Sequence, residues 1–166
     1  MRLLFEIDKK DYEEDGEAFI RPSARAIIFK DGKLAAIYSN KKKYYKIPGG
    51  GIEDGETPID AMIREVREEV GLEVISDSIK EFGYVHRIQK GKNEPVFIQD
   101  NYYYFCDVYE GQIPPNYSEN EIEEEFESVF VSIEDAIKMN EQYVIENPQD
   151  SGAERELRVL KMIRNT

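Results

Sequence analysis

The sequence predicts an α+β fold, in which a mixed sheet carries two or three helices within one domain. Three observations lead to this expectation. Many strand-like segments and two or three helix-like segments occur along the 166 residues, and no low-complexity linker or internal repeat divides them. The pair Asp31-Gly32 separates two apolar segments, as in a β-hairpin. A strongly patterned helix follows a Gly-rich turn at residues 49–51 in the middle of the chain.

The first half of the chain is expected to consist mostly of strands. The segments with strand-like alternation or composition are 3–7, 23–30, 33–38 and 44–47. The last of these leads into the Gly-rich turn. Since glycine has no side chain to hold a ligand away, the backbone of this turn can approach a metal ion or phosphate closely.

The helix predicted over residues 58–70 has well-defined ends. Thr57 is a good N-cap, Pro58 suits the first helical position, and Asp60 can complete a capping box. Gly71 suits the left-handed position after the last turn. These signals fix where the side chains of the helix point.

Two faces of this helix differ in character. An apolar stripe is formed by Ile59, Ile63, Val66 and Val70. The other face carries Glu65, Glu68 and Glu69, which repel one another at this spacing. A hard divalent cation, which prefers oxygen ligands, would compensate for that repulsion. A solvated acidic face is the alternative.

The second half of the chain is expected to contain more strands and a final helix. The strand segments are 73–76, 79–89, 96–108 and 126–133. Ser132 is expected to cap a short helix that runs to Met139. Ser151 and Glu154 have the spacing of a capping box, which opens a C-terminal helix at about 151–164. We expect a core at about 20–145 with this helix packed against it.

Composition limits the functions that the chain can have. A net charge of −13 disfavours general binding to nucleic acid or anionic lipid, because both depend on Lys and Arg. Small phosphorylated ligands remain compatible through bound cations. A single cysteine, Cys106, allows no intrachain disulfide, and no apolar run is long enough for a membrane helix. These features predict a cytoplasmic protein.

The stretch from Gly50 to Leu72 resembles the Nudix box at every defined position. Glu56 follows Gly50 after five residues, and seven more residues precede Arg64-Glu65, Val66, Glu68-Glu69 and Gly71-Leu72. The chain is therefore identified as similar to MutT-like Nudix hydrolases. The resemblance implies an α/β/α sandwich, a Mg2+ or Mn2+ cofactor, and hydrolysis of the P–O–P linkage of a nucleoside diphosphate derivative.

The resemblance also implies roles for individual residues. The metal ligands would be Glu65, Glu68, Glu69 and the carbonyl oxygen of Gly49. Arg64 would orient a box carboxylate, with Glu56 supporting it from outside the ligand set. Glu68 or Glu69 would accept the proton of the attacking water, and the backbone at Gly50 would meet the substrate.

Outside the box, three further residues are candidates for the site. Glu124, chosen by its distance from Phe130 in an acidic run that we expect to be extended, is a candidate metal ligand or base, with a solvated acidic loop as the alternative. Lys46 is a candidate phosphate contact, and Tyr45 could stack on a nucleobase. His86 is a possible proton-transfer group, although a histidine on a sheet face is the more common case.

Two function classes remain open from the sequence. The first is a metal-dependent pyrophosphohydrolase acting on a small nucleoside diphosphate derivative, with nucleoside triphosphates as the default substrate. The second is a Nudix module that binds a nucleotide without turnover. A monomer and a homodimer are both compatible with the sequence.

Overall fold

The computed structural model describes residues 1–166, and its strands form two sheets. The first sheet is mixed, with the order β1-β8-β9-β3-β7 and with β2 paired to β9. Its strands are β1 (Leu3–Asp8), β2 (Ala18–Ile20), β3 (Ser23–Ile27), β7 (Gly49–Gly51), β8 (Lys80–Gln89) and β9 (Val96–Phe105). The second sheet is antiparallel and contains β4 (Phe29–Lys30), β5 (Lys33–Ser39), β6 (Tyr44–Lys46) and β10 (Phe126–Val131).

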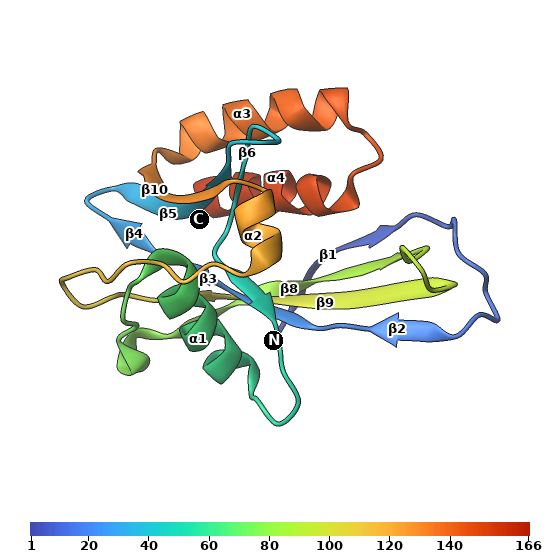
Figure 1. Ribbon diagram of the computed structural model, residues 1–166, viewed down its shortest axis with the longest axis horizontal. Coiled ribbons are helices and arrows are strands. Elements are labelled where there is room, and N and C mark those ends of the chain that lie inside the picture. The colour runs from blue at the N-terminus through green and yellow to red at the C-terminus, as the bar shows by residue number, and fades with distance from the viewer.

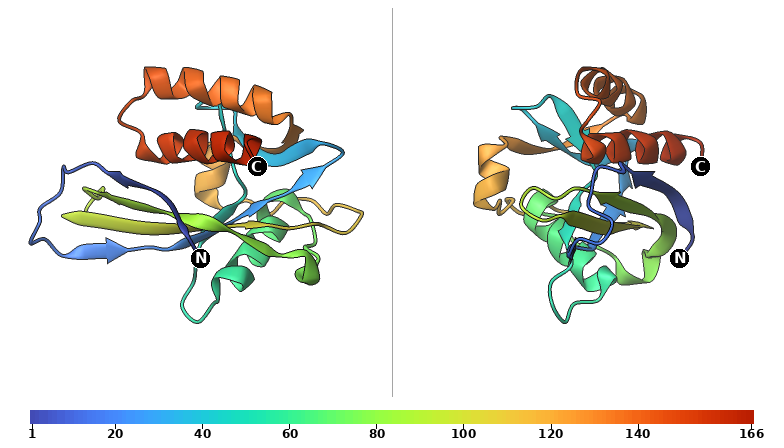
Figure 2. Two further views of the ribbon diagram at one scale, coloured as in Figure 1. Left: turned by 180° about the vertical axis from the view of Figure 1, so that it is seen from behind. Right: turned by 90° about the vertical axis from the view of Figure 1, so that its right-hand side faces the viewer.

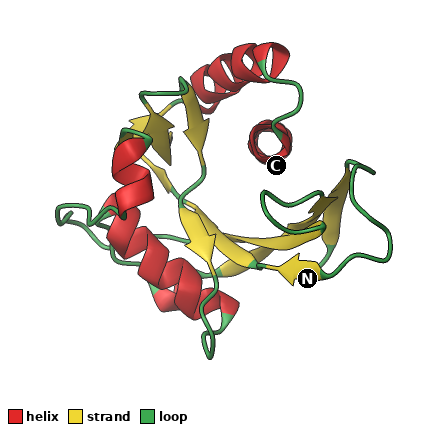
Figure 3. Ribbon diagram, turned by 45° about the vertical axis from the view of Figure 1, so that its right-hand side comes forward, coloured by secondary structure: helices red, strands yellow, loops and turns green.

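Helices cover the two sheets from opposite sides (Figures 1 and 3). They are α1 (Pro58–Val70), α2 (Glu119–Glu123), α3 (Ile133–Glu146) and α4 (Ser151–Arg164). One apolar core lies between α1 and the strands, and includes Met62, Val66 and Val70. A second core lies on the side of α3 and α4, and includes Leu157, Leu160 and Ile163. The predicted α+β class and α/β/α layering are confirmed.

A wing of strands extends from this body. It consists of β1, β2 and the far halves of β8 and β9, and projects to the right in Figure 1 and to the left in the left view of Figure 2. The wing continues the first sheet, because β2 and β3 pair in succession along the same strand β9. Side chains from the wing can therefore share a sheet face with side chains from the body.

The hairpin turn at Asp31-Gly32 is confirmed, with φ angles of 52° and 76°. The segment before it, predicted as one strand over 23–30, is instead divided at the fully buried Ile28. Its first part pairs in the first sheet and its second part in the second sheet. This crossing carries the chain from one sheet to the other.

The ends of α1 agree with the sequence. The hydroxyl of Thr57 accepts a hydrogen bond of 3.1 Å from the Asp60 backbone N–H, and Gly71 has a left-handed φ of 66°. The capping box is incomplete, because Asp60 contributes only its backbone N–H. The apolar stripe is also shifted. Ile59 is exposed, while Ala61 and Met62 are buried in its place.

Several other boundaries differ from the prediction. The Gly-rich segment is the short strand β7, since it pairs with β3. Residues 73–76 form no strand, and a 3-10 turn over Ser76–Ser78 follows the single bridge between Val74 and Val108. Helix α3 extends to Glu146, beyond the predicted Met139.

The C-terminal helix α4 begins as predicted, but with a different cap. Its N-cap is Asp150, whose carboxylate accepts a hydrogen bond of 3.0 Å from the Ala153 backbone N–H. Ser151 is therefore the first residue of the helix, and its hydroxyl donates to the side chain of Gln89 on β8. None of the four helices combines the length and apolar character that crossing a bilayer requires.

Candidate active site

A polar cleft of about 630 Å3 opens where β7, α1 and α2 meet the first sheet. Acidic side chains, most of them from α1 and α2, line it together with cationic side chains from α1 and from the strands and their connections. The acidic residues are Glu53, Glu65, Glu68, Glu69 and Glu121, and the cationic residues are Arg21, Arg25, Lys46 and Arg64. The cleft thus contains all three predicted box carboxylates.

Arg64 organises the outer part of this cluster. Its guanidinium donates to Glu56 with N–O distances of 2.8 and 2.9 Å, to Glu65 at 2.9 Å, and to the carbonyl oxygen of Gly51 at 3.0 Å. A weaker contact of 3.4 Å reaches Glu68. The hydrogen bond from Arg64 lowers the pKa of Glu56 to about 2, so this carboxylate stays ionised beside the guanidinium. The predicted pairing of Arg64 with box carboxylates is what the structure shows.

Glu69 is the most buried carboxylate of the cleft. One of its oxygens accepts a hydrogen bond of 2.8 Å from the Gly49 backbone N–H. Burial, together with a side-chain hydrogen bond to Glu121, raises the pKa of Glu69 well above its ordinary value. Burial also opposes ionisation of Glu121, but its hydrogen bonds with Glu69 and Ser118 together outweigh burial and lower the pKa of Glu121. The pKa values of the two neighbouring carboxyl groups are therefore shifted in opposite directions.

The glycines of β7 are required by the close approach of neighbouring atoms. A Cβ atom on Gly49, whose φ is 149°, would lie 2.3 Å from the carbonyl oxygen of Ala24. A Cβ atom on Gly50 would lie 2.5 Å from Oε1 of Glu65. The backbone of β7 thus lies directly against Glu65 of the carboxylate cluster.

The cations of the cleft differ in how they are held. The side chain of Arg21 makes no hydrogen bond or ion pair, and lies 3.1 Å from where a Cβ on Gly51 would be. Lys46 lies over the ring of Phe126 at 4.6 Å, and burial followed by the nearby Arg25 lowers its pKa. Arg21 and Lys46 are therefore cations without an ion-pair partner, in a chain of net charge −13.

Beneath the cleft lies a buried ionic network that the sequence analysis did not anticipate. Glu156 on α4 pairs with Arg155 at 2.8 Å and with Arg25 at 3.7 Å, and accepts a 3.0 Å hydrogen bond from the Ile47 backbone N–H. Arg25 donates to the carbonyl oxygens of Ile47 at 3.0 Å and Gly49 at 3.5 Å. The C-terminal helix thereby holds the strand that leads into β7. In the sequence, Arg155 and Glu156 stand among other charged residues of the C-terminal segment, and no local pattern marks these two as buried.

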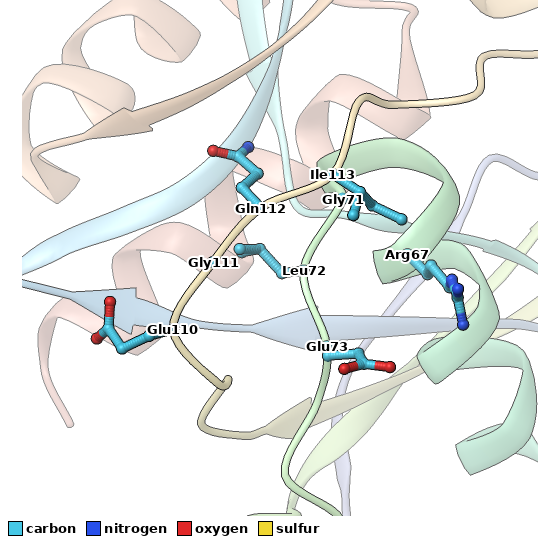
Figure 4. Close-up of a pocket in the computed structure, with 8 residues that line it drawn as sticks. All are labelled: Arg67, Gly71, Leu72, Glu73, Glu110, Gly111, Gln112 and Ile113. Atoms are coloured by element: carbon cyan, nitrogen blue, oxygen red, sulfur yellow. The ribbon is translucent and has the colours of Figure 1, made fainter.

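Hydrogen bonds to the end of α1 fix the loop that carries α2. The backbone N–H groups of Ile113 and Asn116 donate to the carbonyl oxygens of Gly71 at 2.9 Å and Glu68 at 2.7 Å. The side chain of Gln112 reaches the Val70 carbonyl oxygen at 2.9 Å. The loop and the end of α1 enclose a smaller hollow of about 250 Å3, shown in Figure 4. These contacts set the path of the chain toward Glu121.

The structure places two of the candidates outside the box, Glu124 and Tyr45, away from the cleft, and His86 on a sheet face as the more common case predicts. Glu124 does not line the cleft, because residues 119–123 are helical and the carboxylate of Glu124 pairs with Lys42 at 3.4 Å. Tyr45 packs on Tyr38, with ring centroids 4.8 Å apart, and also lies outside the cleft. His86 contacts Asp100 at 2.7 Å on β8 and β9, and does not line the cleft either. Lys46 does line it, as predicted.

The sequence profile described as the NUDIX domain matches residues 20–149. The chain belongs to the Nudix family. The matched stretch includes α1 and β7, which line the cleft described above.

Among Nudix relatives, an RNA pyrophosphohydrolase of Aeromonas hydrophila is 41% identical over 59 residues, covering 35% of this chain and 33% of that protein. The uncharacterized Nudix hydrolase YvcI of Bacillus subtilis is 29% identical over 103 residues, covering 62% of each. The match thus spans less than two thirds of these relatives.

Solved Nudix structures share the fold. A MutT Nudix hydrolase from Burkholderia pseudomallei superposes with a TM-score of 0.54 at 19% identity, covering 70% of this chain and 85% of that one. A Nudix hydrolase from Nitrosomonas europaea gives the same TM-score at 20% identity, covering 73% of this chain and 78% of the other. At this identity the likeness supports the fold alone.

The donor set of the Nudix cleft suits a hard divalent cation, because carboxylates are the ligands that such ions prefer. Glu65 accepts a hydrogen bond from Arg64. Glu69 accepts one from the Gly49 backbone N–H and lies beside Glu121. In this arrangement no three acidic, histidine or cysteine side chains stand close enough to hold an ion together. A cation would thus have to compete with Arg64 and with the Gly49 N–H for these oxygens.

Proposed function

We propose that this Nudix protein is a pyrophosphohydrolase that uses Mg2+ or Mn2+ and cleaves the P–O–P linkage of a nucleoside diphosphate derivative by attack of water. The observation that carries the proposal is the gathering of Glu65, Glu68 and Glu69 in one cleft with unpaired cations. The relatives named RNA pyrophosphohydrolase favour the same type of reaction.

The residues that would hold the cation are Glu65, Glu68, Glu69 and the carbonyl oxygen of Gly49, with Glu121 as a further carboxylate from α2. When bound, a divalent cation neutralises phosphate charge and lowers the pKa of an attacking water. Burial raises the pKa of Glu69, and a ligating carboxyl group must be ionised, so binding of the cation would favour loss of a proton from Glu69. Since the net charge is −13, this neutralisation is what makes the cleft compatible with a polyanion.

The chain's own side chains supply the rest of the reaction. Arg64 holds Glu65 in a fixed orientation, which keeps the carboxylate directed at the β7 backbone. Arg21 and Lys46 have no ion-pair partner and are available to bind the phosphates. Glu121, which lines the cleft beside Glu69 and whose pKa is lowered, would accept the proton of the attacking water.

The direct test is a hydrolysis screen over nucleoside triphosphates, sugar nucleotides and dinucleotides with Mg2+, with Mn2+ and with excess chelator. We expect turnover only with a metal ion, and loss of turnover in Glu69→Gln with the fold retained. Glu73→Gln is the matched control, because Glu73 follows the same helix but lies outside the cleft. Full activity in chelator would contradict the proposal.

A second measurement separates turnover from binding. Calorimetry with a non-hydrolysable diphosphate analogue should show weak binding to the metal-free protein and tight binding with Mg2+. Equal affinity in both conditions would contradict the role given to the metal. Tight, metal-dependent binding of nucleotides without turnover of any compound in the screen would instead identify a nucleotide-sensing module.

A further inference from the structure

The cleft does not end at the carboxylate cluster but continues along the first sheet toward the wing. A second hollow of about 390 Å3 adjoins it, lined by Phe19, Arg21, Arg87, Lys92 and Phe97 among others. Arg21 lines both spaces. Gln99, which lines the cleft, accepts a hydrogen bond of 2.6 Å from Arg87, which lines the second hollow. The two spaces therefore share a boundary made of polar side chains.

The pairing of the strands explains why these residues form one track. Alternate residues of a strand point to the same face of a sheet. Phe19 lies opposite Phe97 in the register of β2 and β9, and Arg87 lies opposite Gln99 in that of β8 and β9. Counting every second residue from Phe19 gives Arg21, Ser23 and Arg25, and these three residues line the cleft. One sheet face therefore runs from the floor of the cleft to the aromatic pair Phe19 and Phe97.

The aromatic pair is accessible. The ring centroids of Phe19 and Phe97 are 6.1 Å apart, and Phe19 remains 45% exposed. The guanidinium of Arg87 lies 5.4 Å from the centroid of the Phe97 ring. Arg21 and Lys92 form no ion pair, and Glu94 is the one carboxylate that lines this hollow. Exposed aromatic rings flanked by cations suit a flat base joined to phosphate.

We propose, resting on the function proposed above, that Phe19 and Phe97 bind the nucleobase of the substrate and that Arg21 binds a phosphate between this base and the cleft. Phe19 directly precedes the stretch matched by the NUDIX profile, and Phe97 lies within it. Tyr45, which the sequence suggested for stacking, packs on Tyr38 and is replaced in this role by the phenylalanine pair.

A tryptophan reporter tests base binding without turnover. The chain contains no tryptophan, so Phe19→Trp introduces a single tryptophan fluorophore beside Phe97. Adenosine 5′-monophosphate should quench this emission saturably, whereas ribose 5-phosphate, which lacks a base, should not. Ile20→Trp is the matched control, because Ile20 is 66% exposed on the opposite face of the same strand. Absence of saturable quenching, or equal quenching at both positions, would overturn the proposal.

Kinetics with Phe19→Ala provide the second arm. The value of kcat/KM for a nucleoside diphosphate derivative should fall by at least about fivefold, as expected for a lost stacking contact. It should stay unchanged for a diphosphate that carries ribose without a base, and Ile20→Ala should change neither value. Size-exclusion chromatography accompanies this arm. A shift from dimer to monomer in Phe19→Ala would assign the exposed pair to a contact between copies, and would overturn the base site.

The quenching and kinetic experiments distinguish failure of the proposed base site from failure of the proposed hydrolase function. If adenosine 5′-monophosphate quenches Phe19→Trp but no compound is hydrolysed, the base site stands and the hydrolase function fails. If hydrolysis proceeds and neither quenching nor the Phe19→Ala kinetics show an effect, the hydrolase function stands and the base site fails.

Discussion

Oε1 of Glu65 lies 2.5 Å from the position that a Cβ atom on Gly50 would occupy. Since the crowded atom is the far end of a flexible side chain, Gly50→Ala should displace the carboxylate while leaving the fold intact. We expect turnover to fall by about tenfold at limiting Mg2+, equivalent to about 1.4 kcal/mol in the barrier. The Mg2+ concentration for half-maximal activity should rise, and thermal unfolding should change little.

Gly51→Ala is the matched control for this prediction. There the added methyl group would meet the Arg21 guanidinium at 3.1 Å and no carboxylate. The Mg2+ requirement of Gly51→Ala should therefore equal that of the wild type. An unchanged Mg2+ requirement in Gly50→Ala as well would show that the position of Glu65 does not matter for the metal.

Glu121 is the residue of the acidic run that we expect to affect turnover. Because its carboxyl group shares a hydrogen bond with Glu69, Glu121→Gln should lower kcat by at least about tenfold at saturating Mg2+. Glu123→Gln and Glu124→Gln are the controls, since Glu123 is exposed and Glu124 pairs with Lys42. Equal rates for all three variants would show that α2 contributes no side chain to the reaction.

The acidic run also shows where sequence reasoning failed. It was predicted to be extended, and alternation then favoured Glu124. The segment is instead a short helix capped by Ser118, which rotates each residue by about 100° and brings Glu121 to Glu69. The cap was readable, since Ser118 and Glu121 have the spacing of a capping box.

The box itself was predictable because its geometry is local. A helix of known ends places Glu65, Glu68 and Glu69 on one side, and Arg64 needs only short-range contacts to reach them. By contrast, Tyr45 and Lys46 were both assigned to the site, although neighbours in a strand point to opposite faces. Only Lys46 lines the cleft. The role of Phe19 depends on strand register between distant segments, which no local pattern specifies.

Arg64→Lys should be a severe change despite the retained charge. One ammonium group cannot replace the planar guanidinium that contacts Glu56, Glu65 and the Gly51 carbonyl oxygen together. We expect a loss of turnover of about tenfold or more. The pKa of Glu56, about 2 beside Arg64, should rise toward its ordinary value, which an NMR titration would detect.

Arg67→Lys serves as the control for Arg64→Lys, because Arg67 is exposed on the next turn of α1 and does not line the cleft. Its turnover and the Glu56 titration should match the wild type. A low pKa of Glu56 that survives in Arg64→Lys would assign the shift to another partner.

The buried network under the cleft leads to a prediction about acid stability. Glu156 is held between Arg155 and Arg25, and its carboxylate also accepts the Ile47 N–H. Burial opposes its ionisation, but the two arginines outweigh burial and lower the pKa of Glu156. The unfolded chain therefore takes up this proton at a higher pH than the folded protein does, so acid favours unfolding.

Glu156→Gln should remove that contribution. At pH 7 the variant should unfold with a free energy about 3–5 kcal/mol lower, because Arg155 and Arg25 lose their buried counter-charge. The contribution of Glu156 is complete above the ordinary pKa of 4.5 and is lost as pH falls below it, so the difference between wild type and variant should narrow in that range. Urea unfolding between pH 3 and pH 7 measures this difference in the free energy of unfolding.

Glu154→Gln is the control, because its partners Lys9 and Arg158 lie at the surface. It should lower the free energy of unfolding by less than about 1 kcal/mol at every pH. A constant difference between wild type and Glu156→Gln across this range would show that the carboxylate is not ionised in the folded protein.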